Sequence, residues 1–363
     1  MTRYEERLQK DLQEIRKRVS DVCKAVVDSV EEAVRALLNL DCKLASQVIL
    51  GDHAINRATR DIDGLCHVFV ALHLPSAGVL RYISSVLRLT REVERVGDYA
   101  VGIARATAQF TQPVSKDVAR DFEIVAADSQ HLLRQAMRAF NESNAELARA
   151  TKQTALHEHA ILDKVYEDLM SEGERGSRRT RDLFGMLFSF TRLARITDQA
   201  KNICEDTLFA ATGEAKGPKH FQILFLDEKN DCRSVMAEAI ARKNFPETGR
   251  YESAGWQPAK RVRPEVLGFL DRHGQETSVV APRAVDTSHR ELATYHLIIS
   301  LEGDARAHLP AIPFYTTLLE WEVGASIGDD EAQLEEAQLE EIYKGLSVRI
   351  RDLMMTLRGE LAS

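Results

Sequence analysis

The amino-acid sequence predicts a multidomain protein: two all-α three-helix bundles related by duplication, followed by an α/β domain with a parallel sheet. Three observations lead to this prediction. The 363 residues exceed what one typical hydrophobic core organises. Residues 1–212 contain only two prolines, Pro75 and Pro113, each between long stretches of helical periodicity. From residue 221 onward, short apolar runs alternate with helical segments.

The first half of the chain has the spacing of helices that pack against each other. Its first apolar residues are separated by four and three positions in turn, which is typical of a helix–helix seam: Leu8, Leu12, Ile15, Val19, Val22 and Val26. The same reasoning predicts five further helices near residues 41–72, 76–107, 115–140, 144–171 and 178–211. Six long helices with short connections indicate bundles, which we assign to residues 1–110 and 111–212.

The two sets of three helices align with each other in a register of 100 residues. Arg95, Asp98 and Ala100 then coincide with Arg195, Asp198 and Ala200. Helical periodicity alone can align unrelated helices. The coincidence of three residue types at fixed spacing favours an internal repeat.

A linker and a change of pattern follow the repeats. Residues 213–220 are rich in Gly, Pro and Lys, which is typical of a linker. The segment 221–363 then contains apolar runs that predict buried strands at 221–226, 251–255 and 296–301. Helices are expected between and after them, at 234–243, 264–273 and 334–361. Strands that alternate with helices predict a parallel sheet covered on both faces.

The composition excludes several classes of protein. Residues 1–220 carry 32 basic and 32 acidic side chains, and residues 221–363 carry 16 and 24, so no basic surface for nucleic acid is expected. No run of about 18 apolar residues predicts a membrane span. Five scattered cysteines without a Cys-x-x-Cys pair, together with a polar start of the chain, predict a cytoplasmic protein without disulfides.

A pair of carboxylates stands out in the third expected helix. Glu94 and Asp98 are four residues apart, so they lie on one helix face, away from the apolar stripe. Hard cations prefer such oxygen ligands, and iron also accepts carboxylates. The alternative is a solvated helix face that Arg91 and Arg95 neutralise.

This helix, with the sequence REVERVGDYAVGIA, and the duplicated bundles resemble the PhoU family over residues 4–212. The resemblance implies clusters of iron or other divalent metal ions on the bundles, bound by Glu/Asp-x-x-x-Asp motifs. It also implies repression of phosphate-starvation signalling through contacts with a phosphate-transport ATPase and a sensor histidine kinase. The protein would thus be peripheral to membrane complexes, and a homodimer is left open.

The motifs of the two repeats depart from the family pattern. Glu94 and Asp98 match it in the first repeat, but Gly102 stands where Asn is usual. The second repeat matches at three positions and has Ala194 in place of a carboxylate; the matching residues are Asp198, Asn202 and Glu205. Each implied metal site therefore lacks one expected ligand.

The start of the α/β segment carries a second resemblance. Over residues 220–361 the chain is similar to low-molecular-weight protein tyrosine phosphatases and related arsenate reductases, which begin with a strand, the motif Cys-x5-Arg-Ser and a helix. Four residues of the loop match: Asn230, Cys232, Arg233 and Ser234. In this family, loop N–H groups, the helix N-terminus and the arginine hold an oxyanion, and the first cysteine is the nucleophile.

The loop departs from that chemistry at its decisive positions. Asp227 stands where the nucleophilic cysteine belongs, Lys229 replaces a glycine, and Asp231 stands where Ser is often found. Ala325-Ser326 occupies the position of the Asp-Pro pair that supplies the general acid. We expect Asp227 to pair with Arg233 and to fill the anion site from within.

These features predict a cytoplasmic regulator of phosphate uptake and phosphate-starvation signalling that acts through protein contacts. The phosphatase-like domain is expected to be a catalytically inactive docking or sensing module. One alternative is an active protein tyrosine phosphatase or arsenate reductase, and another is a metal-binding or metal-sensing helical bundle.

Overall fold

The computed structural model describes residues 3–154, 159–176, 178–215, 217, 220–275, 281–309, 311–314, 316–323 and 334–359. The chain divides into two compact units, Met1–Lys216 and Gly217–Ser363. The boundary lies inside the linker expected at 213–220. The two units are described separately below.

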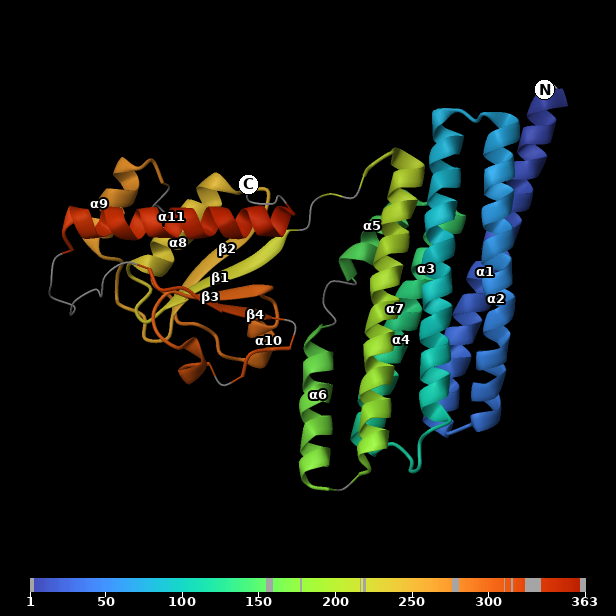
Figure 1. The fold of residues 1–363 in the computed structure, drawn as a ribbon, viewed down its shortest axis with the longest axis horizontal. Helices are drawn as coiled ribbons and strands as arrows, with labels where there is room; N and C mark the ends of the chain where they lie inside the picture. The colour runs from blue at the N-terminus through green and yellow to red at the C-terminus, as the bar shows by residue number, and fades with distance from the viewer. Residues whose placement is uncertain are drawn as a thin grey trace. The chain divides into compact units, whose positions relative to one another are not determined.

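The first unit is entirely helical in its described part, and its long helices lie alongside one another (Figure 1). Its helices are α1 (Arg3–Asn39), α2 (Cys42–His73), α3 (Ala77–Thr107), α4 (Lys116–Asn141), α5 (Ala145–Thr154), α6 (His159–Glu174) and α7 (Thr180–Thr212). Local sequence explains the ends of α2 and α7. The Asp41 carboxylate accepts the N–H groups of Lys43 and Leu44 at 3.0 and 2.9 Å, which caps α2. Gly213 ends α7 at a φ of 81°, a value that glycine adopts easily.

The two repeats share one hydrophobic core instead of forming two separate cores. Val26 of α1, Val86 of α3 and Leu133 of α4 are fully buried in the same cluster. Helix α7 packs along both α3 and α4, so it joins the repeats. The expected continuous helix at 144–171 is described as α5 and α6, and the residues between them lie outside the description.

The second unit contains a four-stranded parallel sheet in the order β2-β1-β3-β4. Its strands are β1 (Phe221–Asp227), β2 (Gly249–Gly255), β3 (Leu297–Ser300) and β4 (Thr317–Glu320). Its helices are α8 (Arg233–Asn244), α9 (Pro264–Arg272), α10 (His289–Leu292), the 3-10 helix η2 (Ala305–Ala307) and α11 (Glu336–Arg358). The sequence did not predict β4, α10 or η2.

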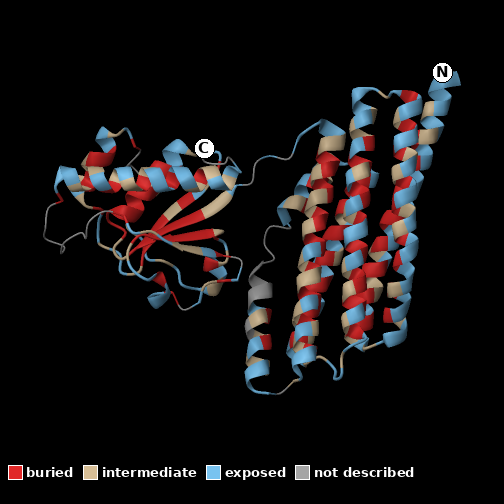
Figure 2. Cartoon of the chain, in the orientation of Figure 1, coloured by how far each residue is buried: buried red, intermediate tan, exposed pale blue. Residues whose placement is uncertain are grey.

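Alternate residues of β1 enter two different cores, so the sheet is covered on both faces (Figure 2). Ile223 and Phe225 pack with α8, α9 and α11. Leu224 and Leu226 pack on the opposite face, in the cluster that contains Leu292 of α10. Burial of both faces is typical of parallel sheets and explains the continuous apolar run of β1.

The sheet brings the ends of its strands to one edge. Asp227, the last residue of β1, pairs with Gly255 of β2, and Leu226 pairs with Ser300 of β3. The carboxyl edge of a parallel sheet is where this architecture places binding sites. Among the helices that the structure describes, none is long and apolar enough to cross a membrane.

Candidate functional site

The loop between β1 and α8 runs from Glu228 to Cys232 and is closely packed. Its backbone turns at Asn230, which has a φ of 49°. The β2 end lies directly against it, because a Cβ on Gly255 would be 2.6 Å from the carbonyl oxygen of Glu228. Only glycine fits there without moving the loop.

The Asp227 carboxylate accepts two backbone N–H groups around this loop. Its Oδ1 accepts the N–H of Asn230 at 2.6 Å, and its Oδ2 accepts the N–H of Ser234 at 2.9 Å. Ser234 lies in the first turn of α8, where N–H groups are free to bind an anion. The side chain of Asp227 therefore uses donors that this type of loop offers to an oxyanion.

Burial controls the ionisation of Asp227. The residue is 3% exposed, and this desolvation raises the pKa of its carboxyl from 3.8 to about 6. The hydrogen bonds from Ser234 and Asn230 oppose the increase, and the charge of Glu302 adds to it. The ionised form therefore predominates at pH 7, about one unit above this pKa.

Arg233 pairs with Glu302. The prediction that Asp227 pairs with Arg233 is therefore wrong. The Nη1 atom of Arg233 lies 3.2 Å from Oε1 of Glu302, and its Nε donates to the carbonyl oxygen of Val323 at 3.1 Å. The other Glu302 oxygen, Oε2, accepts the N–H of Glu228 at 3.3 Å. Glu302 follows β3 at the same edge of the sheet as Asp227, which explains how it reaches the loop.

Sequence reasoning missed Glu302. Its position directly after the predicted strand at 296–301 could have identified it, because the carboxyl ends of parallel strands lie at one edge of the sheet. It lies 69 residues from Arg233 in the chain, so no local spacing connects the two.

The other predicted loop residues are brought together as expected from their spacing. The Asn230 amide donates to the Ser234 hydroxyl at 2.8 Å and accepts the N–H of Arg283 at 2.9 Å. Cys232 is 1% exposed, and burial, with smaller effects of nearby carboxylates, raises the pKa of its thiol to about 12. This thiol is therefore protonated at neutral pH.

Two further positions named from the sequence have different outcomes. Asp231 forms an ion pair with Arg263, with 3.0 Å between Oδ2 and Nε. Both side chains are 11% exposed, so the pair is largely shielded from water. Ala325-Ser326 lies outside the described residues.

In the first repeat, Glu94 and Asp98 lie exposed on α3. Asp52 of α2 is close to Asp98. It is 9% exposed, its Oδ1 has no hydrogen-bond partner among the described residues, and burial, followed by the charge of Asp98, raises its pKa. Gly97 makes room for this carboxylate, since a Cβ there would be 2.8 Å from Asp52 Oδ1. Asp52 and Asp98 therefore lie close together, and Asp52 keeps one oxygen unsatisfied within the described part of the chain.

In the second repeat, cationic side chains approach the predicted ligands. Asp198 lies 3.4 Å from Nη1 of Arg195 and 3.6 Å from Nζ of Lys201, and Glu205 lies 2.9 Å from Nζ of Lys152. A lysine or arginine beside each carboxylate supplies positive charge that a metal ion would otherwise supply. In this structure the predicted carboxylate ligands are thus paired with cations of the chain itself.

Asn202 and Gly102 are the remaining positions of the two motifs, and both lie near side chains of other helices. The Asn202 amide lies 3.5 Å from Oε2 of Glu92, so it connects α7 with α3. The Arg192 side chain fills the space where a Cβ of Gly102 would lie. Among the described residues, no group of three or more His, Cys, Asp or Glu side chains is arranged to hold a metal. Metal binding at Glu94 and Asp98, and at Asp198, Asn202 and Glu205, stays a prediction.

Comparison with known families assigns both units. Residues 19–107 and 122–207 match the PhoU domain, which gives one match for each repeat. Residues 222–362 match the low molecular weight phosphotyrosine protein phosphatase family. The chain joins a duplicated PhoU domain to a low-molecular-weight phosphatase-like domain. The predicted fold class is confirmed.

Individual relatives cover the helical unit. The chain is 28% identical over 204 residues to a phosphate-specific transport system accessory protein PhoU homolog of Rhizobium meliloti, which covers 56% of this chain and 86% of the relative. It is 27% identical over 208 residues to the accessory protein PhoU of Serratia marcescens, covering 56% and 84%. The crystal structure of PhoU from Pseudomonas aeruginosa aligns at a TM-score of 0.55 and 26% identity, over 57% of this chain and 99% of that chain.

Proposed function

We propose that this protein regulates phosphate uptake and phosphate-starvation signalling through protein–protein contacts in the cytoplasm. The duplicated PhoU domain supports this proposal, as do relatives described as accessory proteins of the phosphate-specific transport system. The cytoplasmic location rests on the cysteines, all of which are free thiols. The phosphatase-like unit serves as a non-catalytic docking or sensing module.

The proposal that this unit is non-catalytic rests on one observation. Two carboxylates of the chain itself, Asp227 and Glu302, occupy the hydrogen-bond donors of the loop that would otherwise bind an anion. Asp227 takes the N–H groups of Asn230 and Ser234. Glu302 takes the N–H of Glu228 and pairs with Arg233. An incoming phosphate would have to displace both acids from these donors.

The expected loss of rate and the electrostatic repulsion of phosphate also favour a non-catalytic unit. Loss of a covalent nucleophile costs on the order of 10⁶ in rate. Cys232 does not replace it, because burial raises the pKa of its thiol to about 12. A carboxylate about 4 Å from a phosphate oxygen adds roughly 4 kcal/mol of repulsion per unit charge at an effective dielectric constant near 20.

The partners belong to the proposal as well. We expect the helical unit to contact the ATPase of a phosphate transporter, a sensor histidine kinase, or both. Deletion of the gene should change expression of a phosphate-starvation reporter in phosphate-replete cells, and a chain with Asp227→Ala should restore normal expression. Failure of the intact chain to influence such a reporter would contradict the regulatory role.

An aryl-phosphate assay tests the absence of catalysis directly. The wild-type protein should show no hydrolysis above the buffer rate between pH 5 and pH 8. Asp227→Cys serves as the gain-of-function arm, because it restores a thiol at the N-terminus of α8. Hydrolysis by the wild-type chain that Arg233→Ala abolishes would overturn the non-catalytic reading and favour an active phosphatase.

A further inference from the structure

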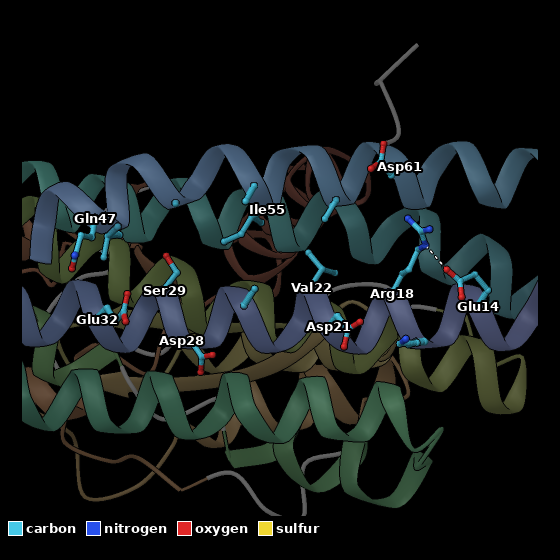
Figure 3. Close-up of a pocket in the computed structure, with 16 residues that line it drawn as sticks. Glu14, Arg18, Asp21, Val22, Asp28, Ser29, Glu32, Gln47, Ile55 and Asp61 are labelled. Carbon is cyan, nitrogen blue, oxygen red and sulfur yellow. Dashed lines mark hydrogen bonds and ion pairs between the residues drawn. The ribbon is translucent and has the colours of Figure 1, made fainter.

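A groove of about 530 Å³ runs between α1 and α2 (Figure 3). Three buried side chains on its floor, Val22, Val48 and Ile55, provide an apolar surface. Sixteen residues line it, and none belongs to the Glu94 and Asp98 motif or to the loop before α8.

Small residues keep the groove open. Gly51, Ala54 and Ala58 form the α2 wall, and Ala25 lies on the α1 side. A Cβ added to Gly51 would have nothing within 4 Å, so this wall has space for an additional group. Apolar floors with small-residue walls allow a helix to approach closely, as in other helix-in-groove complexes.

A row of acids follows the α1 side of the groove. Glu14, Asp21 and Asp28 recur every seven residues, and Glu32 continues the row. Asp61 lies on the α2 side. The lining thus contains five carboxylates and two cations, Lys17 and Arg18. Arg18 pairs with Glu14, with 2.7 Å between Nε and Oε1.

The other four acids have no hydrogen-bond or ion-pair partner among the described side chains: Asp21, Asp28, Glu32 and Asp61. The groove is therefore acidic, although residues 1–220 as a whole carry equal numbers of acidic and basic side chains. This local excess of negative charge matches a basic partner.

A buried hydroxyl points to an occupant. Ser29 is 8% exposed, lines the groove, and its Oγ has no hydrogen-bond partner within the described chain. Buried polar groups normally have partners, because an unsatisfied one costs stability. A donor or acceptor on a bound segment would satisfy it.

We propose that this groove binds a basic amphipathic helix of a partner protein. Residues 14–32 of α1 span about 27 Å at 1.5 Å per residue, which corresponds to about five helical turns. The partner helix would place apolar side chains on Val22, Val48 and Ile55. It would place Lys or Arg at seven-residue spacing opposite Glu14, Asp21 and Asp28, as paired helices do with opposite charges.

A second copy of this chain fits the groove poorly. In a symmetric dimer the same patch lies on both subunits. The acids of one groove would then face those of the other, and like charges that face each other are destabilising. The proposal is also independent of the regulatory function, since a helix can bind here whatever signal it carries.

A peptide binding experiment tests the proposal on the full chain. The probe is a synthetic 21-residue helix with Leu at positions i, i+3, i+4 and i+7 and Lys on both flanks, labelled for fluorescence anisotropy. A matched peptide with Glu in place of Lys is the control. The Lys peptide should bind, its affinity should fall as salt rises, and the Glu peptide should not bind.

Variants locate the binding site. Gly51→Leu should fill the groove and weaken binding of the Lys peptide by roughly tenfold or more, whereas Gly64→Leu, on α2 outside the groove and also with open space, should leave it unchanged. Asp21→Lys combined with Asp28→Lys should also weaken binding by roughly tenfold, because it removes two attractions and adds two repulsions.

The matched charge control is Glu123→Lys combined with Asp128→Lys, two exposed acids of α4. It should bind the Lys peptide as the wild type does. Equal losses in the groove and control variants would overturn the proposal, as would equal binding of both peptides. A dimer in light scattering that Gly51→Leu converts to a monomer would assign the groove to self-association and would also overturn it.

Discussion

Replacement of Asp227 by Asn should remove a pH dependence from the stability of the second unit. Burial raises the pKa of this carboxyl from 3.8 to about 6 in the folded chain. Two pH units at about 1.36 kcal/mol each correspond to about 3 kcal/mol. The folded state holds this proton more tightly than the unfolded state. Protonated Asp227 therefore contributes this stability fully below about pH 4, and the contribution is lost as the pH rises through 6.

Asparagine does not titrate, so the two proteins should respond differently to pH. The stability difference between variant and wild type should shift by about 3 kcal/mol in favour of Asp227→Asn between pH 3 and pH 7. The amide also places an NH₂ against one of the two N–H donors, which costs about 1–3 kcal/mol at every pH. That constant offset does not affect the slope.

Urea unfolding followed by tryptophan fluorescence measures this effect selectively. Both tryptophans of the chain, Trp256 and Trp321, belong to the second unit. Asp271→Asn, at an exposed position of α9, is the matched control and should follow the wild-type pH profile. Parallel profiles for wild type and Asp227→Asn would refute the assignment of a buried, ionised carboxylate at the head of α8.

Three further predictions concern other contacts. Glu302→Ala should remove the carboxylate that contacts Nη1 of Arg233 and the N–H of Glu228, and should thereby open these donors to an added anion. We expect 100 mM sulfate to stabilise this variant in a thermal melt by about 1.4 kcal/mol for a Kd near a tenth of that concentration. Glu320→Ala, at the exposed end of β4, should gain nothing in the same thermal melt. Asp231→Ala should lower the free energy of unfolding of the second unit by about 3 kcal/mol, because it breaks an ion pair whose two side chains are each 11% exposed. An unchanged urea midpoint would contradict this. Gly97→Ala should destabilise the helical unit by up to about 2 kcal/mol in circular dichroism melts. Its Cβ would lie 2.8 Å from Oδ1 of Asp52, an overpacking that costs about 1–3 kcal/mol, and the helix preference of Ala over Gly offsets about 1 kcal/mol of this cost. A stability gain would show that the Asp52 carboxylate moves aside.

Much of the fold was predictable because its signals are local. The spacing of Leu12, Ile15 and Val19 predicts α1, and these residues are buried in the core. The apolar run from Phe221 to Leu226 predicts β1. Strand β4 escaped because it has four residues at the edge of the sheet, with exposed ends and partly buried centres, and so has no clear pattern.

The shared core of the repeats and the contacts of the loop were not predictable in the same way. Sequence periodicity identifies six helices but does not say that α7 packs on α3 of the other repeat. Spacing placed Asp227 beside Arg233, and simple charge attraction suggested a pair. The structure gives the carboxylate backbone N–H donors instead, and Arg233 takes an acid that is distant in sequence. Contacts between distant segments decide which opposite charges meet.

The backbone of the loop is anchored from behind by its neighbours. The carbonyl oxygens of Asp227, Glu228 and Lys229 accept N–H groups from the segment that follows β2, at 3.3, 2.8 and 2.8 Å. The carbonyl of Asp231 accepts the N–H of Arg263 at 3.3 Å. None of these four bonds involves a side chain, so they supplement the two hydrogen bonds that the Asp227 carboxylate accepts around the loop. Under the proposed non-catalytic function, an engineered return to phosphate chemistry would keep these four backbone hydrogen bonds and change side chains.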